Sequence, residues 1–186
     1  MGKIHTEIDS NLTAWLQRQQ MFFVSTAPLA GDGLINCSPK GLDTLRVLGP
    51  RTVAYLDLTG SGVETIAHLK ENGRIVIMLC AFEGAPKIVR FHGRGEVLEP
   101  GHPEFQSLLE QFPRLPGTRA IIRVDVQRIA DSCGFAVPQY TFEGPRDTLI
   151  RYAENRGEDG LEQYRWQNNR QSLDGLPGLD LQPPPG

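Results

Sequence analysis

The chain has 186 residues and a mass of 20.6 kDa, which is enough for one domain of ordinary size and short for two. Hydrophobic residues make up 39% of it and charged residues 22%, so it can form a packed core, which argues against general disorder. The net charge of −3 argues against a general binder of nucleic acids or of anionic membranes.

Further counts narrow the class of protein. The 20 glycines and 14 prolines favour many turns and short strands over a helical bundle. The longest apolar run, residues 75–82, is far shorter than the roughly 20 residues of a membrane-spanning helix, and residues 1–10 lack the pattern of a secretory signal. The cysteines are far apart and show no metal-ligand spacing, which predicts reduced thiols in a cytoplasmic protein and no metal site. They are Cys37, Cys80 and Cys133.

The first third of the chain predicts a short helix followed by four strands. Asp9 or Ser10 can cap the helix, whose apolar residues recur at helical spacing. We expect Pro39 to end the second strand, and the turn at Gly49-Pro50 to join the last two strands as a hairpin. The four strands are expected over residues 21–26, 34–38, 45–48 and 52–58.

The middle of the chain predicts a helix between strands. Gly60-Ser61-Gly62 opens this helix, and Asn72-Gly73, a pair suited to a left-handed cap, ends it. The apolar run 75–82 then predicts a strand buried on both faces. In the next strand, residues 87–98, polar and apolar side chains alternate, and two glycines indicate a bend or a bulge.

The last third predicts more helix than strand. A helix over residues 103–112 and a strand over 120–129 are followed by two helical stretches, at about 146–155 and 160–171. The tail from Ser172 ends in a proline-rich sequence, so we expect it to be extended or disordered.

These elements predict a mainly β protein of six or seven short strands. Hairpin-length links favour an antiparallel sheet, and closing that sheet into a small barrel would remove its exposed edges. One face of the run 75–82 would then fill the barrel. Its other face must then be buried by a helix or by a second subunit, and we favour a second subunit.

Three motifs, in this order and spacing, resemble the pyridoxamine 5′-phosphate oxidase-like proteins, the FMN-binding split barrels. The motifs are Asn36–Gly41 (NCSPKG), Gly60–Thr65 (GSGVET) with Asn72, and Val89–Gly93 (VRFHG). The likeness covers roughly residues 10–130 and points to a branch related to the oxidase, not to the oxidase itself. It implies a six- to seven-stranded antiparallel split barrel of Greek-key type with C-terminal helices, and a homodimer that holds FMN where its two barrels meet.

The resemblance also implies a division of the chain. Residues 1–142 would form the FMN-binding split barrel, and residues 143–171 a helical extension of the same domain. Residues 172–186 would form the extended or disordered tail.

The first motif holds two candidate cofactor-binding residues. The phosphate of FMN needs cations, hydroxyls and backbone N–H groups, such as those at the start of a helix. Lys40 follows a proline, and family members carry a Lys or Arg at this place; the alternative is an exposed turn lysine. Ser38 can hydrogen-bond the phosphate or the ring edge, or it can simply cap the turn.

The second motif adds Ser61 and Thr65 as candidate phosphate ligands. A competing interpretation is that Ser61 and Glu64 form a capping box, which would satisfy the same N–H groups within the chain. Many relatives have a Lys or Arg near the position of Glu64. A carboxylate repels a phosphate unless a cation such as Lys40 lies between them.

The strand that carries the third motif places Arg90, His92 and Arg94 on one face. The resemblance favours Arg90 as a group that meets the phosphate or the N1–C2=O edge of a reduced flavin. The alternative is a solvated strand face. No residue is assigned to catalysis, because His92 has no general-base partner visible in the sequence.

The resemblance implies an FMN-dependent oxidoreductase with a small-molecule substrate or electron donor. The chain departs from the true oxidase after residue 140, because it has no histidine after His102 and lacks the substrate-binding segment. Two alternatives stay open. One is a non-catalytic flavin-binding sensor or carrier, and the other is a split barrel that has lost its ligand.

Overall fold

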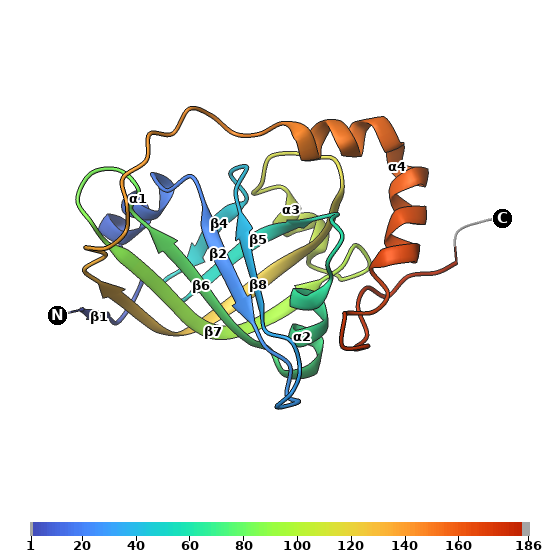
Figure 1. Cartoon of the computed structure of the whole chain (residues 1–186), viewed down its shortest axis with the longest axis horizontal. Coiled ribbons are helices and arrows are strands. Elements are labelled where there is room, and N and C mark those ends of the chain that lie inside the picture. The colour runs from blue at the N-terminus through green and yellow to red at the C-terminus, as the bar shows by residue number, and fades with distance from the viewer. Residues whose placement is uncertain (1, 184–186) are drawn as a thin grey trace.

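The computed structural model describes residues 2–183 of the chain, which contain eight strands and four helices (Figure 1). The protein is mainly β, as predicted. In chain order the elements are β1 (Ile4–His5), α1 (Ser10–Gln17), β2 (Phe22–Thr26), β3 (Asn36–Lys40), β4 (Leu45–Gly49), β5 (Thr52–Leu58), α2 (Glu64–Asn72), β6 (Arg74–Cys80), β7 (Ile88–Leu98), α3 (Phe105–Leu109), β8 (Thr118–Ser132) and α4 (Thr148–Asn168).

All the strands belong to one antiparallel sheet. Their order is β3-β2-β6-β7-β8-β5-β4, with β1 paired to β8. The end strands β3 and β4 do not pair with each other in the described chain, so the barrel is split between them. This confirms the predicted antiparallel split barrel. The strand beyond the predicted six or seven is β1, whose two residues are too few to give a sequence pattern.

The barrel interior is filled by side chains that lie opposite one another in register. One such row crosses four strands through Val24, Ile77, Phe91 and Ile129, each with no exposed surface. The helix α1 packs on this core at one end of the barrel and α2 at the other (Figure 1). In β7, where apolar and polar residues alternate, Val89 and Phe91 face this core and are buried, while Arg90 and His92 lie on the other face.

Two parts of the outer face of the barrel differ in whether a helix packs on them. On β5, β7 and β8, outward residues such as Leu56, Leu98 and Ile121 pack against α3 in a second apolar cluster. On β2 and β6, the outward residues Phe23, Val76 and Met78 are only half-buried, and neither core cluster includes them. The strand predicted to be buried on both faces is thus half-buried on its outer face in the single chain.

Several local predictions are confirmed. The carboxylate of Asp9 accepts the N–H of Leu12 at 2.7 Å and caps α1. Gly73, with φ of 68°, ends α2 in the left-handed conformation. A bulge lies between His92 and Gly93, where a Cβ atom would collide with the carbonyl oxygen of Asp125. Only glycine allows the strands to approach so closely there.

The prediction that Pro39 ends its strand is wrong. The strand β3 begins and ends two residues later than expected, and Pro39 lies inside it, opposite Phe23 of β2. Proline is tolerated because β3 is an edge strand, which pairs on one side only.

The C-terminal part forms α4 and an irregular segment. The two predicted helical stretches correspond to α4, which is interrupted at Gly157, where φ is 64° and ψ is 174°. Beyond α4 the described chain has one isolated bridge, from Gln171 to Pro177, and Leu179 is buried in the barrel core. Residues 184–186 of the predicted tail lie outside the described residues.

None of the helices between residues 2 and 183 combines the length and apolar character that crossing a membrane requires.

Candidate ligand site at the barrel opening

A cavity of about 250 Å³ lies on the open side of the barrel, between β3 and the segment that joins β5 to α2. Arg119 of β8 and Leu149 of α4 complete its wall. Three of the predicted cofactor-binding residues line it together, namely Ser38, Lys40 and Thr65. The structure therefore brings the first two sequence motifs to one place.

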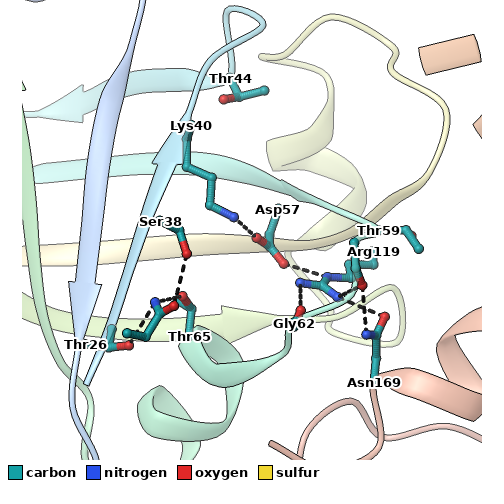
Figure 2. A network of polar contacts seen from close by, with 12 residues as sticks. Thr26, Ser38, Lys40, Thr44, Asp57, Thr59, Gly62, Thr65, Arg119 and Asn169 are labelled. Atoms are coloured by element: carbon teal, nitrogen blue, oxygen red, sulfur yellow. Dashed lines mark hydrogen bonds and ion pairs between the residues drawn. The ribbon is translucent and has the colours of Figure 1, made fainter. Parts of the chain in front are cut away.

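Asp57 lies between two cations beside this cavity (Figure 2). Its Oδ1 atom accepts a hydrogen bond from Nζ of Lys40 at 2.8 Å, and its Oδ2 atom accepts one from Nε of Arg119 at 2.7 Å. Burial by itself would raise the pKa of Asp57. Attraction to Arg119 and Lys40, with the hydrogen bonds from both, outweighs burial and lowers that pKa from 3.8 to about 2. Asp57 is therefore ionised at neutral pH and ties together three strands.

The guanidinium group of Arg119 is used in hydrogen bonds within the chain. A register shift between Asp57 and Leu58 leaves it as an extra residue in β8, and it is only 5% exposed. Besides Asp57, its guanidinium donates to the carbonyl oxygen of Gly62 at 2.8 Å and to Oδ1 of Asn169 at 2.8 Å (Figure 2). Few of its N–H groups are left for a ligand.

Lys40 differs from Arg119 because most of its N–H donors have no partner within the described chain. Its side chain is 22% exposed, and Asp57 is its one hydrogen-bond partner among residues 2–183. An ammonium group has three N–H donors, so two of them remain for a ligand in the cavity.

Asn36 links the two predicted hydroxyl groups. Its Nδ2 atom donates to Oγ1 of Thr65 at 2.9 Å, and its Oδ1 atom accepts from Oγ of Ser38 at 3.0 Å (Figure 2). Because Thr65 accepts this bond, its own hydroxyl proton is available for an acceptor in the cavity.

The helix α2 begins at Glu64, and no side chain caps it. The competing interpretation, a capping box of Ser61 and Glu64, is therefore wrong. Ser61, predicted to bind the cofactor, is exposed and does not line the cavity. The N–H groups of Glu64 and Thr65 have no acceptor within the described chain. The Glu64 carboxylate lines the cavity as well, and its Oε1 atom accepts the N–H of Leu173 at 3.3 Å.

Arg90 lies away from this cavity. It pairs in register with Met78 of β6 and Ala130 of β8, and its Nη1 atom donates to Oγ of Ser132 at 3.0 Å. The structure therefore does not bring the third motif to the first two, and a role for Arg90 in binding stays a prediction.

Three residues of the site were not predicted: Asp57, Arg119 and Asn169. One signal was present, because Asp57 is the single charged residue in the apolar strand TVAYLDL, and a buried charge needs a partner. Nothing in the sequence points to a partner 62 residues later in the chain. Asn169 follows a helix without any pattern that would mark it.

The fold defines a split-barrel protein with a cavity lined by polar residues at its opening. Residues 8–133 match the pyridoxamine 5′-phosphate oxidase family. The chain is 42% identical over 198 residues to ustO, a pyridoxamine 5′-phosphate oxidase family protein of Aspergillus flavus, which covers 96% of this chain and 78% of that protein. The chain belongs to the pyridoxamine 5′-phosphate oxidase family.

Solved structures share the fold at low sequence identity. HupZ of Group A Streptococcus has a TM-score of 0.53 and 22% identity, over 66% of this chain and 91% of that one. A candidate pyridoxamine 5′-phosphate oxidase from Lactobacillus delbrueckii has a TM-score of 0.51 and 16% identity, over 68% of this chain and 98% of that one. These similarities are in fold alone.

The lining of the cavity offers groups for binding but few groups for acid–base or nucleophilic chemistry. Its titratable lining residues are Lys40, Glu64 and Arg119, and no histidine or cysteine between residues 2 and 183 lines it. It therefore has no nucleophile and base in contact.

Proposed function

We propose that the protein is an FMN-dependent oxidoreductase that binds flavin mononucleotide where two copies of the chain meet. The observation that carries the proposal is the uncapped start of α2, which opens onto one cavity together with Lys40 and Thr65. Membership of the pyridoxamine 5′-phosphate oxidase family supports it.

The donors around the cavity fit a phosphate group. The free N–H groups of Glu64 and Thr65 lie at the positive end of the helix dipole, and a nine-residue helix aligns enough peptide dipoles to favour an anion there. The Thr65 hydroxyl and the two remaining N–H donors of Lys40 add to this set. Together they supply the cation, the hydroxyl and the backbone donors that a phosphate requires.

Glu64 is the carboxylate that lines the cavity and opposes an anion there. Its carboxylate is drawn toward Leu173 by the hydrogen bond to Oε1, and Lys40 supplies the opposite charge on the β3 side of the cavity. A phosphate is therefore tolerated as long as Glu64 keeps its contact with the C-terminal segment. We expect this carboxylate to weaken the binding of FMN.

The ring of the flavin needs more room than one chain provides. The cavity of about 250 Å³ is smaller than the roughly 300–1,000 Å³ of typical ligand pockets. The half-buried outward residues Phe23, Val76 and Met78 supply an apolar surface on β2 and β6 that a second copy would cover. A homodimer would therefore both bury this surface and enclose the ring.

FMN, when bound, supplies a ring that accepts a hydride from a donor and passes electrons on. The residues of this chain would bind and orient it. Lys40 and Thr65 would hold the phosphate, and Ser38 would bond the phosphate or the ring edge. We place this activity in the cytoplasm, because all three cysteines are free thiols.

A non-catalytic flavin sensor or carrier is the second candidate. One observation favours it: the titratable side chains that line the cavity in the described chain are Lys40, Glu64 and Arg119, with no histidine or cysteine among them. Rapid NADPH oxidation by the FMN-loaded protein would exclude this candidate, whereas stoichiometric flavin without turnover would favour it over the oxidoreductase.

The proposal is tested on the purified full chain. We expect a flavin absorption spectrum, release of FMN on denaturation as identified by mass spectrometry, and a melting temperature that rises when FMN is added. A colourless protein whose melting temperature responds to neither FMN nor riboflavin would overturn the proposal. Native mass spectrometry with no ligand and no response to FMN would favour a barrel that has lost its ligand.

A further inference from the structure

Asn169, the residue that follows α4, uses all its polar groups within the fold. Its side chain has no exposed surface. Its Nδ2 atom donates to the carbonyl oxygen of Gly60 at 3.0 Å, and its Oδ1 atom accepts from Nη1 of Arg119 at 2.8 Å. Its backbone N–H donates to Arg165 and its carbonyl oxygen accepts from Leu179. The amide of Asn169 is therefore held in a single orientation.

The contacts of Asn169 reach the turn from which α2 begins. Asn169 holds the carbonyl oxygen of Gly60, and Arg119, which Asn169 holds in turn, donates to the carbonyl oxygen of Gly62 (Figure 2). Glu64 and Thr65, which follow this turn and open α2, line the cavity.

A second line of contacts runs from Asn169 to Lys40. Arg119 holds one oxygen of the buried Asp57 carboxylate, and Lys40 is bound to the other oxygen. Because a carboxylate is rigid, the position of Arg119 determines where the second oxygen points, and with it where the ammonium group of Lys40 lies. Both groups of phosphate donors are thus linked to the same amide through Arg119.

The C-terminal segment stays anchored without the side chain of Asn169. Nζ of Lys70 donates to the carbonyl oxygen of Gly178 at 2.6 Å, and Nε of Arg165 donates to Oγ1 of Thr59 at 2.8 Å. Leu161 and Leu179 are buried. Removing the amide should therefore leave the segment docked, so its effect on the site can be measured separately.

We propose that Asn169 is a positioning residue of the ligand site, through which the C-terminal segment fixes Lys40 and the start of α2 for an anionic group. This inference rests on the proposed function and deepens it. It assigns a binding role to a segment that lies beyond residues 8–133, the part of the chain that matches the family.

The test compares FMN with riboflavin, which has the same ring and no phosphate. Binding of each to the full chain is followed by flavin fluorescence, for the wild type, Asn169→Ala and Asn168→Ala. Asn168 is the matched control, because it is exposed and its amide bonds only Tyr164 of its own helix. We expect Asn169→Ala to weaken FMN at least about tenfold and to leave riboflavin within about twofold, with Asn168→Ala unchanged for both.

A second variant keeps the test decisive if Asn169→Ala does not fold. Asn169→Asp retains the shape of the side chain and an acceptor for Arg119, but it replaces the N–H donor to the carbonyl oxygen of Gly60 with an oxygen. We expect it to fold and to weaken FMN at least about tenfold, with riboflavin unaffected.

The results separate the two proposals. Equal FMN affinity in the wild type and both Asn169 variants would overturn the role of Asn169 alone. Equal losses of FMN and riboflavin would overturn it too, because they would show a merely structural role. A wild type that binds neither flavin would overturn the proposed function itself, and the role of Asn169 with it.

Discussion

The two cations that bind the Asp57 carboxylate, Arg119 and Lys40, differ in burial and in their other hydrogen bonds. On one side Arg119 is 5% exposed and is also bonded to Gly62 and Asn169. On the other side Lys40 has a side chain 22% exposed and no further hydrogen-bond partner within the described chain. One carboxylate therefore separates a cation that stabilises the fold from a cation that is available to a ligand. The predictions below test this division, beginning with the largest effect.

Replacing the shared carboxylate should have the largest effect on stability. Asp57→Asn leaves Arg119 buried without its counter-ion, and breaking a buried ion pair in this way costs about 3–5 kcal/mol. We expect that loss in the free energy of unfolding, measured by chemical denaturation at pH 7. The control is Asp43→Asn, whose side chain is 77% exposed beside Arg46 and should change stability by less than about 1 kcal/mol. A similar small loss for Asp57→Asn would contradict the account.

Replacing each cation in turn separates the two sides. Arg119→Met removes the buried partner of Asp57 and several hydrogen bonds, and should cost about 3 kcal/mol of unfolding free energy. Lys40→Met leaves Asp57 paired with Arg119 and should cost about 1 kcal/mol. The same denaturation experiments measure both values. Equal losses would show that the two cations serve the fold alike.

The pH dependence of stability should show the ionisation of Asp57. Its pKa in the folded chain is about 2, below the usual 3.8, so its contribution is fully present above that usual value and is lost as the pH falls through the folded pKa. Between about pH 5 and pH 2 the wild type should therefore lose roughly 2 kcal/mol that Asp57→Asn does not lose. Parallel curves of unfolding free energy for the two proteins would be evidence against this ionised state.

The outer face of β6 should affect assembly more than stability. Met78→Glu places a charge on the half-buried face that a second copy would cover, and should change the unfolding free energy of the single chain by less than about 0.5 kcal/mol. We expect it to convert a dimer into a monomer, as measured by light scattering. Gln106→Glu on α3, which covers the opposite outer face, is the control and should stay dimeric. A monomeric wild type would remove the proposed dimer.

The sequence was sufficient for most of the fold because its strands follow simple patterns. Alternation over 87–98 and the turn at Gly49 are local signals, and the structure has β7 and the β4–β5 hairpin there. The two-residue β1 could not be predicted, because its pairing with β8 depends on residues far along the chain.

The site could be predicted only in part, for a related reason. Ser38, Lys40 and Thr65 were found through motifs, and they share a cavity. The placement of Arg90 depended on the path of the sheet, in which β7 is separated from β3 by β2 and β6. The pairing of Asp57 with Arg119 arises from a bulge between β5 and β8, and no local pattern encodes it.

The most direct test of the account is a titration of the wild type and Lys40→Met with FMN and with riboflavin. If Lys40 is the cation left for a phosphate, the wild type should bind FMN at least about tenfold more tightly than riboflavin, and Lys40→Met should reduce that preference severalfold. A wild type that binds both flavins equally, or a Lys40→Met variant that keeps the full preference for FMN, would contradict it.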